Sequence, residues 1–366
     1  MTHVSKGERA YHIFYGLLRG LNAKECGDLK LEHAKPSSYR YLSCGETGAA
    51  SERMDDVQIW NLVVQSLSDQ AISKDEQTLY WQCLAGVLHL GNVEFDPKNR
   101  DEGVPTSGAA AALQKCEVVL GLQSGLLQKA LCKRKIKAGN EFIEQPLSHD
   151  QACDGRDALS KAIYSRLFDR LIAQINTALK AGGEAAGEAE RRIIGVVDIF
   201  GFEVFGVNSL EQLCINFANE KLQALFTKAV FKETIAAYEA DGIKADEITY
   251  QDNASLIEMF DTPKVGLWAV LTEECVVPKG TDGGFSEKLH AAQKGCKVIS
   301  IVKGKAASEG FGIAHFAGAV TYSSNGWLNK NKDPLNADLM VLMQFSDNNV
   351  LASLFQSQVT TTTRGR

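Results

Sequence analysis

The stretch that decides the fold is IIGVVDIFGFE, residues 193–203. Its run from Ile193 to Val197 is rich in β-branched residues and ends at Asp198, which predicts a strand covered on both faces in a mostly parallel sheet. A carboxylate at the carboxyl end of such a strand commonly holds a nucleotide-bound magnesium, and Gly201 would let a backbone N–H approach a terminal phosphate. Apolar strands that end in Asp also occur simply before a turn, so the spacing alone leaves both interpretations open.

A long helix is expected soon after this strand, in the segment NSLEQLCINFANEKLQ, residues 208–223. Asn208 can cap it, with Glu211 at the third position, and apolar residues recur near helical spacing toward Tyr238. Roughly 30 residues at ~1.5 Å each give a rod of about 45 Å. Such a rod exceeds the needs of one small core and could carry a displacement between distant sites.

The rest of the chain is expected to form helices joined by polar loops and one hairpin. Ser73, followed by Glu76 three residues later, predicts a capping box on a buried helix that closes on Gly91. Loops are expected at Glu102 to Ala112 and at Ala181 to Ala189. The other predicted elements are helices at Tyr11 to Leu21, Gln151 to Leu179, Ser255 to Phe260, Leu267 to Cys275 and Ser286 to Ala292, and hairpin strands at Phe311 to Phe316 and Ala319 to Tyr322.

Composition narrows the class of protein. The 366 residues carry 39 basic and 45 acidic side chains, a formal charge of -6, so nothing global calls for nucleic acid or an anionic membrane. No apolar stretch resembles a signal peptide or reaches the ~18 residues of a membrane span, so we expect a cytoplasmic protein. The nine cysteines include no CxxC pair and are expected to be reduced, with Cys83 and Cys214 in core positions. His12, His89 and His315 are expected to be core histidines.

Taken as a whole, DIFGFE (residues 198–203) followed by residues 208–223 closely resembles switch II and the relay helix of myosin. The resemblance continues in GERAYHIFY (7–15), LHLGN (88–92) and KNKDPL (330–335). In order, these look like successive landmarks of one motor domain. The implied fold is α/β and predominantly helical, an incomplete P-loop NTPase-type myosin motor core with one clear central-sheet strand.

The resemblance assigns roles within DIFGFE. Asp198 would sit near the magnesium ion of Mg-ATP, and Gly201 would donate its amide to the γ-phosphate. Glu203 would pair with an arginine of switch I to close the site. Closure matters because phosphoryl transfer depends on placement and charge stabilisation. The relay helix would then transmit closure to the converter.

A second group, Lys133, Arg134, Lys135 and Lys137, here called the basic arm, precedes Gly139-Asn140, which predicts a two-residue hairpin turn. From the sequence alone, an edge hairpin kept soluble by lysines is the favoured explanation. The myosin resemblance reverses this, because it places the upper actin-contacting loop here, and a basic arm suits the acidic surface of actin. Glu141 would occupy the position where myosins carry an acidic or a phosphorylatable residue.

The segment EECVVPKGTD, residues 273–282, resembles the helix-loop-helix of the family's lower actin-binding region. Val276, Val277 and Pro278 are candidate apolar contacts with actin, and Lys279 follows them. In an unrelated protein this would be a surface turn.

The resemblance also implies parts that these residues do not contain. Myosins hold the phosphates with a loop ending in Gly-Lys-Ser/Thr, and no such sequence occurs here; the nearest imitation, GETGAA at residues 45–50, lacks the lysine. Switch I would precede Gly7, and the reactive-thiol helix, converter and lever arm would follow Phe355. We therefore expect no tight Mg-ATP binding by this chain alone and doubtful folding of the sheet region. Light chains and cargo would bind absent regions.

Four parts are expected. These are a portion of the upper actin-binding subdomain (1–190), the switch II strand and loop (191–207), the relay helix with the lower actin-binding subdomain (208–355), and a disordered tail (356–366). The complete domain would couple Mg-ATP hydrolysis to movement on actin filaments, in the cytoskeleton. The alternative is an actin-binding or scaffolding module that does not hydrolyse ATP.

Overall fold

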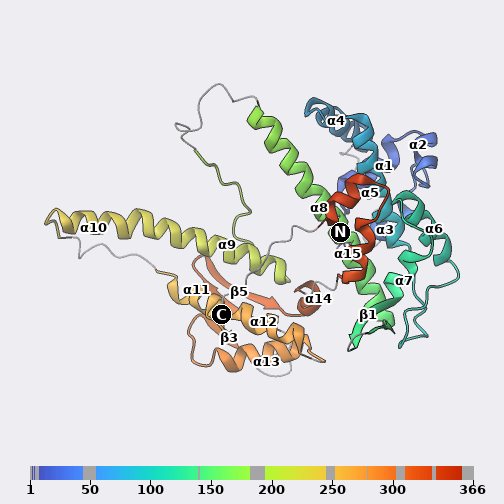
Figure 1. The fold of residues 1–366 in the computed structure, drawn as a ribbon. Coiled ribbons are helices and arrows are strands. Elements are labelled where there is room, and N and C mark those ends of the chain that lie inside the picture. The colour runs from blue at the N-terminus through green and yellow to red at the C-terminus, as the bar shows by residue number, and fades with distance from the viewer. Residues whose placement is uncertain are drawn as a thin grey trace. The chain divides into compact units, whose positions relative to one another are not determined.

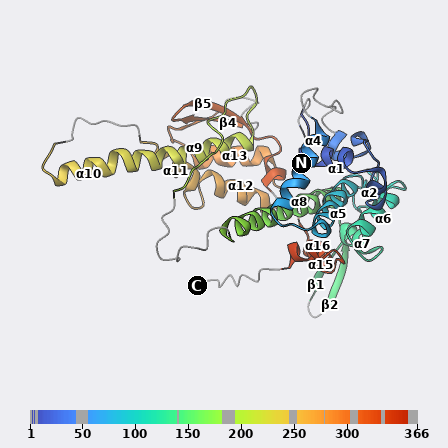
Figure 2. The same cartoon turned by 90° about the horizontal axis from the view of Figure 1, so that it is seen from above.

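The chain divides into two compact units (Figures 1 and 2). Unit 1 comprises Met1–Arg191 and Asp333–Arg366, and unit 2 comprises Arg192–Lys332. How they correspond to the expected subdomains stays a prediction. The computed structural model describes residues 2, 4, 8–43, 55–138, 141–181, 194–244, 252–277, 279–301, 310–331 and 335–356.

Unit 1 is a helical assembly around one apolar core, in which α5 packs against α6 and α8. The Ser73 side chain accepts a hydrogen bond from the Glu76 N–H, so the Ser73 half of the capping box predicted for α5 is confirmed. The Glu76 carboxylate instead binds Arg170 and Gln174 of α8, at 2.8 Å each, and thereby ties the two helices together. The elements are α1 (His12–Gly20), α2 (Ala23–Asp28), η1 (Pro36–Ser38), α3 (Arg40–Ser43), α4 (Asp56–Asp69), α5 (Lys74–Gly91), α6 (Ala109–Val119), α7 (Leu126–Cys132), β1 (Lys133–Ala138), β2 (Glu141–Pro146), α8 (His149–Ala181), α15 (Ala337–Gln344) and α16 (Asn349–Phe355).

Two histidines of unit 1 differ from each other. His89 is buried as predicted, and its Nε2 lies 3.0 Å from the carbonyl oxygen of Leu29. Burial lowers the pKa of His89 to about 4, so the neutral ring donates its Nε2–H to that carbonyl. The prediction was wrong for His12, which is exposed at the start of α1.

Unit 2 packs its helices against a small antiparallel sheet of order β3-β4-β5. The predicted hairpin is confirmed as β4 and β5, and β3 adds a third strand. Phe285, Phe311 and Trp327 lie ring against ring in the core. The elements are α9 (Leu210–Thr227), η3 (Lys228–Lys232, a π-helical turn), α10 (Glu233–Ala240), α11 (Ala254–Asp261), α12 (Leu267–Val276), α13 (Asp282–Ala292), β3 (Ile299–Ile301), β4 (Gly310–His315), β5 (Gly318–Ser323) and α14 (Trp327–Asn331).

The long helix is confirmed, because α9, η3 and α10 follow one another without a break, as Figure 1 shows. Its cap was predicted one residue too early: Ser209 is the N-cap, and its N–H donates to Gln212 Oε1 at 3.0 Å. Asn208 is buried, and its side chain accepts from the Phe205 N–H at 2.7 Å and donates to the Thr321 carbonyl at 3.1 Å. It therefore closes the preceding turn onto β5 and cannot serve α9.

The strand predicted at residues 193–198 is wrong over its described part. Residues 194–200 have no regular secondary structure, and Ile194 and Val196 are more than nine-tenths exposed. A parallel strand needs neighbours that satisfy its backbone groups, and no strand in the described part of unit 2 pairs with this run. A single bridge, Asn208 to Tyr322, touches β5 farther along. The predominantly helical fold is thus confirmed, and the central-sheet strand is corrected.

Smaller differences concern loops and cysteines. The loop predicted at Glu102 to Ala112 ends early, because α6 begins at Ala109. The eight cysteines in the described ranges are free; Cys83 is buried, whereas Cys214 is exposed, contrary to prediction. The second predicted loop beyond residue 181, the turn at 139–140 and the tail beyond residue 356 lie outside the described residues. None of the helices that the structure describes is both long and apolar enough to cross a bilayer.

Candidate functional site

The DIFGFE segment (residues 198–203) leads toward α9 and presents its polar groups unevenly. Asp198 is exposed, and within the described ranges its carboxylate makes no ion pair. Gly201 is also exposed, and apart from its chain neighbours no atom of the described residues lies within 4 Å of the position that a Cβ would take. Glu203 is half-buried, and one of its carboxylate oxygens lies 3.5 Å from Gln212 Nε2. An unpaired carboxylate and an unobstructed backbone thus lie in one short segment.

Asparagine side chains of α9 hold the backbone of this segment. Asn216, fully buried, accepts from the Glu203 N–H and donates to the Glu203 carbonyl, both at 2.8 Å. One turn farther along, Asn219 donates to the Phe200 carbonyl at 3.0 Å. The N–H and the carbonyl of Glu203 are therefore both hydrogen-bonded to the side-chain amide of Asn216. In a β-sheet the backbone of a neighbouring strand would supply these two bonds.

A buried polar network continues from Asn216 into the sheet. Asn216 Nδ2 donates to the Tyr322 hydroxyl at 2.8 Å, and that hydroxyl lies 2.8 Å from His315 Nε2. His315 Nδ1 lies 3.0 Å from Glu220 Oε1. The Asn216 amide donates to the Tyr322 hydroxyl, and the two ring nitrogens of His315 join that hydroxyl to the Glu220 carboxylate. The network therefore runs from α9 through β5 and β4 back to α9.

Glu220 is the charged end of this network, with a fully buried side chain. Its carboxylate also accepts from the Phe316 N–H at 2.9 Å and from the Asn253 amide. Burial alone would raise the pKa of Glu220, but the donors His315, Asn253 and Phe316 outweigh it, so the pKa lies below its usual range. Burial raises the pKa of Tyr322 to about 12. At neutral pH the network thus holds one carboxylate and a neutral phenol.

The sequence pattern does not single out Asn216 and Glu220 as site residues, and it predicts His315 only as a core histidine. A signal was present, because Asn216 and Glu220 stand three and seven residues after Leu213, on the apolar stripe of α9. A polar residue at such a position is buried only with partners. Those partners lie on β4 and β5, about a hundred residues away in the sequence, which the spacing does not reveal.

The basic arm forms the predicted hairpin of β1 and β2, with Lys135 opposite Glu144 and Lys137 opposite Phe142. Lys133 and Lys129 share the Glu144 carboxylate, at 3.7 and 2.5 Å. The bond from Lys129 lowers the pKa of Glu144. The Arg134 guanidinium donates two hydrogen bonds to Gln145 Oε1, at 2.8 and 3.0 Å. The Lys135 ammonium forms no ion pair with the described residues. Glu141 is exposed at the start of β2.

The helix-loop-helix predicted at residues 273–282 corresponds to α12, a short loop and α13. Val276 is 77% exposed and Val277 39%, while Lys279 is exposed with a left-handed φ of 63°. Pro278 lies outside the described residues. The loop is shaped from beneath by buried Glu274, whose carboxylate accepts from the Thr281 N–H at 3.1 Å.

The structure keeps the predicted residues in separate groups. Asp198, Gly201 and Glu203 share one segment of unit 2, Val276, Val277 and Lys279 share another loop of that unit, and the basic arm belongs to unit 1. In the described ranges no group of three or more His, Cys, Asp or Glu side chains could hold a metal ion. Within its segment Asp198 is therefore a single exposed carboxylate.

The family model of the myosin head (motor domain) matches this chain over residues 1–365. It includes DIFGFE, the long helix, the basic arm and the helix-loop-helix. Since it leaves out only the last of 366 residues, the chain belongs to the myosin head (motor domain) family.

Proposed function

We propose that this chain contacts actin filaments through the basic arm and the α12–α13 loop, and that DIFGFE is its nucleotide-responsive segment. In a complete motor domain these parts would couple Mg-ATP hydrolysis to movement on actin. The observation that carries the proposal is the pair of exposed surfaces, one cationic and one apolar, at the two positions where the family resemblance expects actin.

The basic arm suits an acidic protein surface because its cations exceed the carboxylates beside them. Lys133, Arg134, Lys135 and Lys137 stand on one strand, while Glu144 is the only acidic residue of β2 besides exposed Glu141. Such an excess speeds and orients association with a negatively charged partner and is sensitive to salt. Glu141 already supplies a negative charge at the start of β2, so we expect no need for phosphorylation there.

The α12–α13 loop suits a short-range apolar contact. Val276, at the end of α12, is 77% exposed, so its apolar side chain is in contact with water. Burial of this side chain against a partner surface would be favourable, because apolar area would be removed from water. Pro278 would extend this apolar tip and Lys279 would flank it with a charge. The buried Glu274 beneath the loop holds it in one shape, which favours binding because less order must be gained on contact.

For Mg-ATP, the residues present are a partial set. Asp198 offers a carboxylate near which the magnesium ion would sit, Gly201 offers an unobstructed amide for the γ-phosphate, and Glu203 would close the site against switch I. Bound Mg-ATP would supply the phosphoryl group and the charge that orders the segment. No Gly-Lys-Ser/Thr loop occurs in these 366 residues, so hydrolysis would need phosphate-binding elements from outside them.

For this reason the alternative, an actin-binding or scaffolding module without hydrolysis, is retained for the chain by itself. Either activity would operate in the cytoplasm, on the actin cytoskeleton. The two differ in one measurable property: a chain that binds Mg-ATP with a dissociation constant of roughly micromolar order would refute the incomplete-site proposal. Titration with a fluorescent ATP analogue in excess Mg²⁺ measures it.

Co-sedimentation with actin filaments tests the actin proposal. The double variant Lys133→Glu/Lys135→Glu should lose most of its binding, and the loss should shrink as salt is raised. The matched control is Lys24→Glu/Lys161→Glu, two exposed lysines elsewhere in unit 1 with the same change in net charge. Equal loss in both variants would show that only net charge matters and would reject the basic arm as a specific contact.

A further inference from the structure

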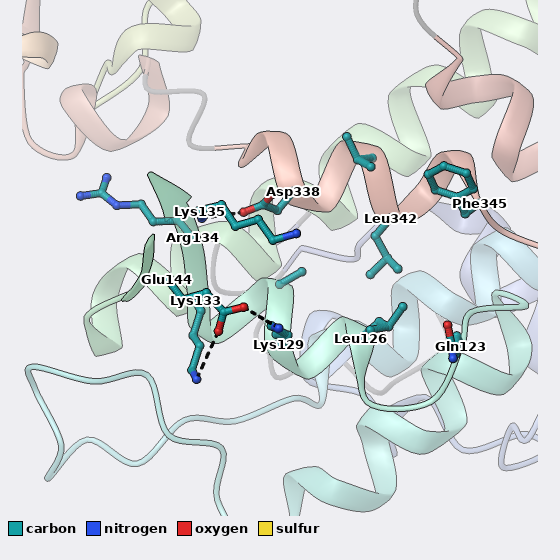
Figure 3. Close-up of a pocket in the computed structure, with 12 residues that line it drawn as sticks. Gln123, Leu126, Lys129, Lys133, Arg134, Lys135, Glu144, Asp338, Leu342 and Phe345 are labelled. Carbon is teal, nitrogen blue, oxygen red and sulfur yellow. Dashed lines mark hydrogen bonds and ion pairs between the residues drawn. The ribbon is translucent and has the colours of Figure 1, made fainter. Parts of the chain in front are cut away.

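A hollow of about 440 Å³ opens in unit 1 between α7 and α15, next to the start of β1 (Figure 3). Its floor is apolar and comes from both helices. In Figure 3, Leu126 of α7 and Leu342 of α15 point into it from opposite sides, and Phe345 stands at one end. Leu126, Val341 and Phe345 are 39, 49 and 78% exposed, so this is an apolar groove open to solvent. We call it the α7–α15 groove.

Cations crowd one edge of the groove. Lys129, Lys133, Arg134 and Lys135 line it, against the two carboxylates Glu144 and Asp338, so the lining carries an excess of two positive charges. The chain as a whole has a formal charge of -6, which makes this edge a local reversal of sign. An open apolar floor beside a cationic edge offers two kinds of contact that one ligand can use together.

The existing ion pairs leave part of this charge uncompensated. Glu144 is shared by Lys129 and Lys133, and the Asp338 carboxylate accepts from the backbone N–H of Lys135 at 2.9 Å. In the described part of unit 1 the Lys135 ammonium has no carboxylate partner. Figure 3 shows this side chain lying along the groove between Asp338 and Leu342. A negatively charged group placed over the apolar floor would be within its reach.

The dimensions favour a short helix as the occupant. α15 has 8 residues, so the wall it offers is about 12 Å long at ~1.5 Å per residue, roughly two turns. A two-turn helix that lies in such a groove presents apolar residues at positions i, i+3 or i+4, and i+7. Its flank toward β1 would need acidic residues to meet the uncompensated cations.

We propose that the α7–α15 groove binds an acidic amphipathic peptide segment of a partner protein, with its apolar stripe on Leu126, Val341 and Leu342 and its acidic flank toward Lys135. This goes beyond actin binding by the basic arm, because the floor is formed by helices that the arm does not include. The ligand class is set by the two features together: charge alone would accept any anion, and the floor alone any apolar peptide.

Fluorescence anisotropy with the full chain and no actin present tests the proposal. The probe is a fluorescein-labelled peptide of about 12 residues with leucines at helical spacing and glutamates elsewhere. Val341→Asp and Lys135→Glu should each weaken its binding roughly ten-fold or more, since each removes one of the two required features. The control Leu62→Asp, an exposed leucine on α4, should bind like the parent chain.

Two further peptides complete the design. One keeps the glutamates but moves the leucines off helical spacing, and one keeps the leucines but replaces each glutamate by lysine. Binding of the first peptide as tight as that of the probe, or a Val341→Asp chain that binds like the parent, would overturn the groove as the site. Loss of binding in the groove variants alone, with circular dichroism unchanged, supports it.

Discussion

Removal of the Asn216 side chain should release the DIFGFE backbone without unfolding unit 2. Asn216→Ala deletes three hydrogen bonds, two to the peptide groups of Glu203 and one to the Tyr322 hydroxyl. Each is worth about 1 kcal/mol net, because half-buried Glu203 can turn to water and Tyr322 keeps its bond to His315. Only the two bonds to Glu203 are broken when the segment opens locally, so the opening becomes easier by roughly 2 kcal/mol, which corresponds to about thirty-fold more frequent local opening.

Hydrogen exchange followed by mass spectrometry measures this opening directly. The Glu203 amide, which donates to Asn216 at 2.8 Å, should exchange about thirty-fold faster in the variant. The matched control is Asn219→Ala, which removes one bond to the exposed Phe200 carbonyl and should cost no more than about 1 kcal/mol. Peptides from β4 should keep their protection in both variants.

Two results would refute this reasoning. If Asn216→Ala and Asn219→Ala accelerate exchange equally, the double bond to Glu203 carries no special share of the local stability. If protection is lost across β4 and β5 as well, Asn216 supports the whole unit and is not a local clamp on the DIFGFE segment.

Three further predictions concern the loop and the buried titratable groups. A Cβ on Gly280 would lie 2.1 Å from the Glu274 carbonyl oxygen, so Gly280→Ala should distort the α12–α13 loop and weaken actin co-sedimentation, whereas Gly206→Ala, with open space around it, should not. Because burial lowers the pKa of His89 to about 4 from an unfolded value near 6.5, the stability of unit 1 should fall by about 3 kcal/mol as pH drops from ~6.5 to ~4; His89→Gln should lose this dependence in urea unfolding. The pKa of Glu220 is lowered, so its contribution is present above the unfolded value of about 4.3 and is lost in more acidic solution; Glu220→Gln should flatten the acid limb of the unit 2 unfolding curve monitored by hydrogen exchange.

The helices could be predicted because their signals are local. Caps such as Ser73 and apolar residues at helical spacing sit within a few residues of one another, and they place α5, α8 and the α9–α10 rod correctly. The run at 194–198 has an equally strong β pattern, yet a strand is stable only with partners, and the pattern contains no information about them. The N-cap of α9 is Ser209 and not Asn208 for a similar reason, because the Asn208 side chain donates a hydrogen bond to the Thr321 carbonyl of β5.

In the candidate site, too, the residues with local sequence signals could be predicted and those that depend on distant partners could not. Asp198, Gly201 and Glu203 could be named from a contiguous string, whereas the groups that hold this string needed the structure. Glu220 and His315 stand far apart in the chain and meet only because β4 packs beside α9. A polar side chain on the apolar stripe of a helix indicates that it has a hydrogen-bond partner in the folded protein. Which residue is that partner depends on the tertiary fold.

The contacts around DIFGFE fix its backbone at Phe200 and Glu203 and leave Asp198 and Gly201 exposed. Asn216 holds both peptide groups of Glu203, while Asp198 and Gly201 face solvent. A ligand that pulled on the amide of Gly201 would therefore act on α9 through Asn219, which holds the carbonyl of the same peptide group, and through Asn216 two residues farther along. α9 could not shift without disturbing the Tyr322, His315 and Glu220 bonds. Only a few arrangements of such a network give every buried polar group a hydrogen-bond partner. Small displacements of DIFGFE would therefore be resisted, and larger displacements would move α9 as a unit.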